Sequence, residues 1–182
     1  MHLLVDHPFD MEFERTEFSD ETYSVIGRAL TYAQKFEGDC KALRLLLEEV
    51  SGSMRSADLF EDEESFKEFV VRLHDQTLYA QVRAISKRLQ LPGDIEGILQ
   101  AARSRRNAIA HEICLGIQGD IESDGGQQRV VQDIAAATRR IAEAHVVVLV
   151  GICELTDKSL PTKKYLDAYR DRVVQWVCDT VA

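Results

Sequence analysis

The segment QRVVQDIAAATRRIAEAHVVVLVGICELT, residues 128–156, has the clearest structural signal in the chain. Its apolar side chains recur at steps of three and four residues, which is the period of an amphipathic α-helix. Residues 146–150 are all aliphatic, so the predicted helix is apolar on nearly every side there. A helix of that kind lies at the centre of a protein or in an oligomer contact. The segment therefore predicts a long central helix.

Other segments repeat the helical period on either side of it. A first helix is predicted from Ser19–Asp20–Glu21 to about Ser51–Gly52, with acidic residues in its first turn. The remaining predicted helices run from about Glu63 to Leu91, from Ile95 onward with Asp94 as its cap, and from Leu160–Pro161–Thr162 to Val177.

These segments predict an all-α protein, a bundle of about five helices, because no alternating strand of useful length competes with them. Residues 1–18 show no clean period and are expected to form an N-terminal arm or a short leading helix. Residues 19–182 are expected to form one helical domain. Gly116 to Gln127, with its glycines and polar side chains, predicts the main loop.

The charge balance limits the classes of function. The chain has 182 residues and a formal net charge of −9. A passive nucleic-acid coat protein needs many cations facing phosphates, so it is excluded, whereas an enzyme that grips a few phosphates is not. No apolar run reaches the roughly 20 residues of a membrane span, and no secretory signal is visible. We expect a cytoplasmic protein that does not associate with membranes.

The cysteines predict neither disulfides nor a metal site. Cys40, Cys114, Cys153 and Cys178 are scattered and form no Cys-x-x-Cys pair, so we expect small buried residues in a reducing compartment. His111 and Cys114 are three residues apart and face the same way on a helix, but no further ligand pattern accompanies them. No metal or other cofactor is predicted.

Basic residues gather before one histidine-containing segment. Between residues 83 and 106 the chain has only Asp94 and Glu96 as acids, whereas residues 58–64 are strongly acidic. We expect the cations of this region to bind RNA phosphates if the protein acts on RNA. They are Arg83, Lys87, Arg88, Arg103 and Arg105.

The segment that follows is Arg105-Arg106-Asn107-Ala108-Ile109-Ala110-His111-Glu112. Asn107 and His111 are four residues apart, so on a regular helix they share a face and can touch. The stretch from Arg140 to His145 has a similar arginine-to-histidine spacing. His145 falls on the apolar stripe of the central helix, however, and is interpreted as a packed or interface histidine. The surroundings therefore favour His111.

The segment Arg106 to Glu112 resembles the signature of the HEPN superfamily (higher eukaryotes and prokaryotes nucleotide-binding domains). In that family an arginine, a polar residue and a later histidine recur on an all-helical bundle. Many members are endoribonucleases of toxin–antitoxin, abortive-infection and CRISPR-associated systems, and others are non-catalytic partners. The resemblance implies a hydrolase that acts on RNA, with an antitoxin or regulatory protein as a further partner. Ile113 stands where partner-silenced members have a tyrosine.

Under this resemblance the chemistry needs no metal. RNA supplies its own nucleophile, the 2′-hydroxyl, and His111 would take its proton or protonate the leaving 5′-oxygen. Arg106 would stabilise the pentavalent phosphate with its planar fork of donors, and Asn107 would orient the imidazole or the phosphate. The products would be a 2′,3′-cyclic phosphate and a 5′-hydroxyl.

One geometric constraint shapes the expected assembly. On an unbroken α-helix Arg106 and His111 point about 140° apart and do not converge. Either the helix is irregular there or the site is composite, as the family resemblance implies, with residues of two chains lining one cleft. We therefore expect a homodimer with residues 103–115 at or near the interface. The alternatives are a non-catalytic helical interaction module and a regulator that binds an anionic ligand through its arginines.

Overall fold

The computed structural model describes residues 17–50, 63–113 and 124–179, and it confirms the all-α prediction. The described residues form six α-helices, one short π-helix and no strand. None of these helices is both long and apolar enough to cross a membrane. In chain order they are α1 (Glu17–Val50), α3 (Glu63–Asp75), α4 (Leu78–Leu89), α5 (Gly93–Asn107), η1 (Ala108–Ile113), α7 (Asp124–Leu155) and α8 (Lys163–Cys178).

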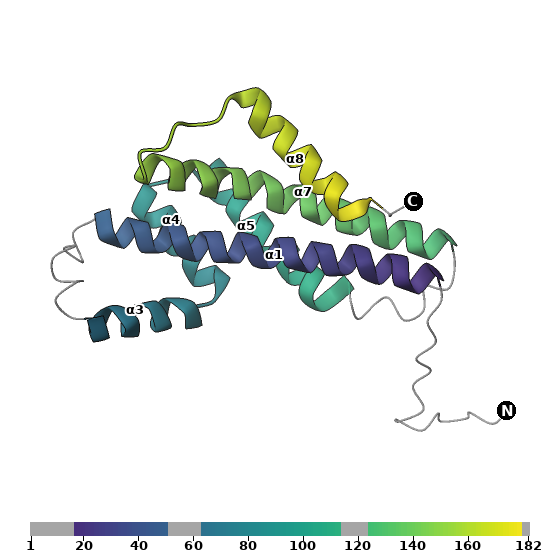
Figure 1. The fold of residues 1–182 in the computed structure, drawn as a ribbon, viewed down its shortest axis with the longest axis horizontal. Coiled ribbons are helices and arrows are strands. Elements are labelled where there is room, and N and C mark those ends of the chain that lie inside the picture. The colour runs from purple at the N-terminus through teal and green to yellow at the C-terminus, as the bar shows by residue number, and fades with distance from the viewer. Residues whose placement is uncertain (1–16, 51–62, 114–123, 180–182) are drawn as a thin grey trace, which may run out of the picture.

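The two longest helices, α1 and α7, lie side by side along the length of the molecule (Figure 1). Helix α8 packs along α7, α5 packs against α7, and α4 packs against α1. Most of the largest fully buried side chains come from α1 and α7, among them Phe36, Leu43, Ile134, Ile141 and Val148. This arrangement confirms that the segment 128–156 forms a central helix, as its apolar stripe predicted.

The prediction of a single helix from Glu63 to Leu91 is wrong, because this segment forms two helices, α3 and α4. Helix α3 ends at Asp75, and the side chain of Thr77 then accepts a hydrogen bond from the backbone N–H of Ala80, which makes Thr77 the N-cap of α4. The Thr77 side chain satisfies a backbone N–H that the first turn of a new helix leaves without a partner. This capping bond does not change the apolar period, so the period alone did not show the break. Helix α4 ends at Leu89, and its C-cap Gln90 has a left-handed backbone with φ of 50°.

The other corrections concern helix ends. Helix α1 begins at Glu17, two residues before the predicted start, and α5 begins at Gly93 with Pro92 as its cap, so Asp94 lies in the first turn. Helix α7 begins at Asp124, so the last part of the predicted loop, Gly125 to Gln127, is helical. The predicted arm up to residue 16 and loop residues 116–123 lie outside the described residues.

Packing of α7 makes a testable contribution to stability. Val148 is fully buried and Val71 of α3 is 57% exposed, so the same truncation is made in two environments. We expect Val148→Ala to lower the free energy of unfolding by about 2–3 kcal/mol, through lost burial and the cavity left behind. Val71→Ala should stay within about 0.5 kcal/mol of the parent. Urea unfolding of both variants measures the difference, and equal losses would contradict the observed core.

Candidate functional site

The helix that carries the arginine-to-histidine segment is irregular. Helix α5 ends at Asn107, and Ala108–Ile113 continue it as a π-helix, whose backbone N–H groups bond to carbonyls five residues earlier. Residues five apart therefore lie nearer one another around the axis than they do on an α-helix. Fully buried Ile109 anchors this turn in the core. The helix between Arg106 and His111 is thus irregular, but no hydrogen bond or ion pair joins these two side chains.

Arg106 is held in place by α1. Its Nη2 lies 2.7 Å from Oε2 of Glu37, and its Nη1 donates a hydrogen bond of 3.3 Å to Oδ1 of Asn107. Oε1 of Glu37 also lies 3.3 Å from Nζ of Lys41. The side chains of Arg106 and Glu37 are 24% and 19% exposed, so the pair is screened from solvent but still open to it. The guanidinium therefore has a defined direction before any ligand binds.

Beside this pair the surface is hollowed. The hollow has a volume of about 390 Å³, and Arg103 contributes a second guanidinium to it. The guanidinium carbon of Arg103 lies 4.9 Å from the centre of the Tyr79 ring, and its buried Nε has no hydrogen-bond acceptor among the described residues. The lining residues are Glu37, Thr77, Leu78, Tyr79, Arg103, Arg106 and Asn107.

His111 is not part of that hollow. It is exposed and makes no hydrogen bond or ion pair with any described residue, so the predicted contact with Asn107 is not seen as a hydrogen bond. Within one chain, Arg106 and Asn107 come together and His111 stands apart.

The predicted RNA-binding cations lie in three separate hollows, except for Arg83, which lines none of them. Arg103 lies with Arg106, whereas Arg105 lines a different hollow of about 440 Å³ between the arginine-to-histidine segment and α7. Lys87 and Arg88 line a third hollow of about 570 Å³ with Arg44 of α1. Arg83 is exposed on α4.

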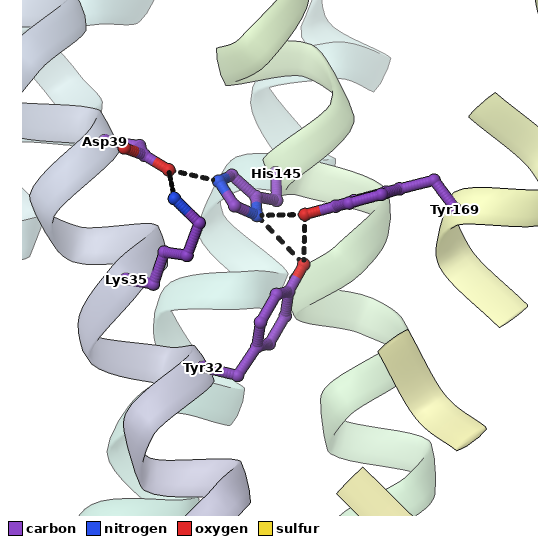
Figure 2. A network of polar contacts seen from close by, with 5 residues as sticks. All are labelled: Tyr32, Lys35, Asp39, His145 and Tyr169. Carbon is purple, nitrogen blue, oxygen red and sulfur yellow. Dashed lines mark hydrogen bonds and ion pairs between the residues drawn. The ribbon is translucent and has the colours of Figure 1, made fainter. Parts of the chain in front are cut away.

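A buried polar cluster that the sequence did not reveal surrounds His145 (Figure 2). The imidazole is fully buried, its Nε2 lies 2.6 Å from Oδ2 of Asp39, and its Nδ1 lies 2.9 Å from the hydroxyl oxygens of Tyr32 and Tyr169. A carboxylate only accepts, so Nε2 carries the proton and Nδ1 accepts from the tyrosines. Lys35 completes the cluster with an ion pair of 3.0 Å to the same Asp39 oxygen.

This cluster joins three helices, and the imidazole at its centre is fully buried. Tyr32 and Asp39 belong to α1, His145 to α7 and Tyr169 to α8. Burial lowers the pKa of His145, although Asp39 acts in the opposite direction, and burial raises the pKa of both tyrosines. His145 is thus a neutral, packed histidine, and its partners lie 24 to 113 residues away, where no local pattern could reveal them.

Metal ligation and cysteine chemistry find no support in the described residues. These residues contain no group of three or more potential metal ligands among histidine, cysteine and acidic side chains. Cys40, Cys153 and Cys178 are free thiols, and burial raises the pKa of Cys40, which keeps that thiol protonated. Cys114 lies outside the described residues.

The comparisons with known proteins identify no relative. No family model, no curated protein and no solved structure matches this chain. The function must therefore be inferred from the side chains and their geometry.

The His145 cluster predicts a dependence of stability on pH. The unfolded imidazole takes up a proton below a pKa of about 6.5, and the folded one only at lower pH. The contribution of the buried, neutral imidazole to the free energy of unfolding is therefore complete above that pH. It is lost as the pH falls toward the lowered pKa. Between about pH 7.5 and pH 5 we expect the parent to lose more unfolding free energy than His145→Gln.

The matched control is His111→Gln, because that histidine is exposed and without a partner among the described residues. Its stability should follow the parent at every pH in chemical denaturation. If parent and His145→Gln lose equal stability on acidification, the buried imidazole is not the titrating group.

Proposed function

We propose that this protein is a metal-independent endoribonuclease of the toxin or defence type, with a site completed at a homodimer interface. One observation carries the proposal: Arg106 is oriented by Glu37 and Asn107 in an open hollow, and an irregular turn separates it from exposed His111. A directed guanidinium and an accessible imidazole, brought together by two chains, are the minimal equipment for cleaving a phosphodiester that brings its own nucleophile.

The proposed reaction is a transesterification. The 2′-oxygen of RNA forms a new bond to phosphorus while the bond to the 5′-oxygen breaks, so one phosphodiester becomes a 2′,3′-cyclic phosphate and a 5′-hydroxyl. The imidazole of His111 removes the 2′-hydroxyl proton, and the imidazolium formed in this way returns a proton to the leaving 5′-oxygen. Arg106 cannot act as a base, and its fork of donors stabilises the additional charge on the phosphate.

The separation within one chain supports the dimer. His111 does not line the hollow that contains Arg106, so His111 of a second copy would meet that hollow across a two-fold axis. Exposed His111 and Glu112 and the partly buried Ala108 leave room for close approach of another helix.

A non-catalytic helical module is the second candidate, and the Arg106–Glu37 pair favours it. That ion pair joins α5 to α1 and explains the arginine without any RNA. The two candidates differ in what the phosphate does. In the ribonuclease a phosphate competes with Glu37 for the guanidinium, whereas in the module the pair stays closed.

Cleavage of single-stranded RNA in the presence of a chelator tests the proposal. We expect Arg106→Ala and His111→Ala each to lower the cleavage rate by about 10²-fold or more, because each removes a group that acts in the transition state. Asn107→Ala should have a smaller effect. Arg139→Ala is the matched control, since Arg139 is also an arginine paired with a carboxylate, that of Asp171, but it is exposed on α7 and lines none of the three hollows.

The products should end in a 2′,3′-cyclic phosphate and begin with a 5′-hydroxyl. Unfolding curves of each variant separate lost chemistry from lost folding. Full activity in both Arg106→Ala and His111→Ala would exclude the proposed site.

Mixing the two inactive variants tests whether the site is shared between chains. If Arg106 of one copy acts with His111 of the other, a heterodimer of Arg106→Ala and His111→Ala contains one intact site of two. Random exchange of subunits should then restore about a quarter of the parent activity. If the mixture stays inactive although exchange is complete, both groups act within one chain.

A further inference from the structure

Helix α4 is basic along its exposed side. Its 12 residues contain Arg83, Lys87 and Arg88 and no acidic residue, in a chain whose net charge is −9. Arg83 and Lys87 are exposed, four residues apart and on one helix face, and neither is paired with a carboxylate of the described residues. This charge is therefore available to an anionic partner.

The aromatic ring of Tyr79 lies at the N-terminal end of the same helix face. Tyr79 precedes Arg83 by four residues, so both lie on one side of α4. Tyr79 is 46% exposed, although Arg103 lies over its ring. An exposed ring beside a planar guanidinium is the arrangement on which unpaired bases stack.

A hollow lies at each end of this side of α4. Near the start of α4 is the hollow with Arg106, and near its end is the hollow lined by Arg44, Ala84, Lys87, Arg88 and Gln90. Arg88 lies 2.7 Å from Glu48, which also pairs with Arg44. The buried Nε of Arg44 has no acceptor among the described residues.

The charges of this face do not cancel. We define the α4 face as Tyr79, Arg83 and the residues lining the two hollows, with Lys41 and Glu48, which pair with their members. Its carboxylates, Glu37 and Glu48, are each paired with two cations. Its cations are Lys41, Arg44, Arg83, Lys87, Arg88, Arg103 and Arg106.

We propose that the α4 face is a track for single-stranded nucleic acid that leads to Arg106, with Tyr79 as a stacking platform. From Tyr79 to Lys87 the helix rises about 12 Å, which matches about four nucleotides of a stacked strand at about 3.4 Å each. A duplex would hide its bases from the ring, whereas a single strand exposes them. The inference rests on the proposed function, because it takes RNA as the substrate and adds its strandedness and path.

Binding is measured without cleavage by using a fluorescent octamer of 2′-O-methyluridine, which lacks the nucleophilic hydroxyl. We expect saturable anisotropy changes, with a slope of log K against log salt of about −2 if three phosphates are contacted. The double variant Arg83→Glu/Lys87→Glu should weaken binding about 10-fold or more and flatten that slope. Lys163→Glu/Lys164→Glu on α8 changes the net charge equally and should leave binding unchanged.

Stacking is tested with two tyrosines in similar settings. Tyr79→Leu should weaken binding of the octamer about five-fold or more. Tyr165→Leu is the matched control, because Tyr165 is 52% exposed and lies beneath Arg172 at 5.2 Å, but on α8. A duplex of the same length should bind more weakly than the single strand.

The outcomes separate this inference from the ribonuclease proposal. Tight binding that depends on Arg83, Lys87 and Tyr79 supports the track even if RNA is never cut. Equal binding by the α4 and α8 variants, tighter binding of the duplex, or binding of an acidic peptide in place of the octamer would overturn it. Cleavage of RNA with an unchanged KM in Arg83→Glu/Lys87→Glu would overturn the track and leave the catalytic proposal standing.

Discussion

The burial of α7 against α1 is the constraint on which the rest of this structure depends. These two helices supply most of the large core side chains, and α4, α5 and α8 each pack on one or both of them. The His145 cluster lies within this contact and makes it specific, since its hydrogen bonds require one register of α1, α7 and α8. A buried imidazole without these partners would cost stability, so the cluster also selects against other packings.

The same packing prepares the candidate site. Helix α1 supplies Glu37, which directs the guanidinium of Arg106, and buried Ile109 holds the π-helix that follows α5. A π-turn places an extra residue in the helix and is found often at functional sites. The position of His111 relative to Arg106 therefore results from core packing and not from helix geometry alone.

The charged side chains of this acidic protein are distributed unevenly over its surface. The α4 face concentrates cations in a chain with 31 acidic side chains, and two of its carboxylates serve to orient arginines. A local basic surface on an acidic protein can bind a short polyanion and still avoid long-range attraction to nucleic acid in general. The net charge alone therefore does not exclude local binding of a polyanion.

The sequence by itself determined the helical class and the central helix, because apolar periodicity is a property of neighbouring residues. From local spacing it also singled out the segment Arg106 to His111 as a candidate site. It also indicated most helix ends to within a few residues, but it missed the break at Thr77, where a single side-chain hydrogen bond starts a new helix. Only the tertiary structure decided that Arg106 meets Glu37, that His145 meets Asp39 and two tyrosines, and that the helix widens at Ala108. Those contacts join residues far apart in the chain, and their energies exist only once the helices have packed.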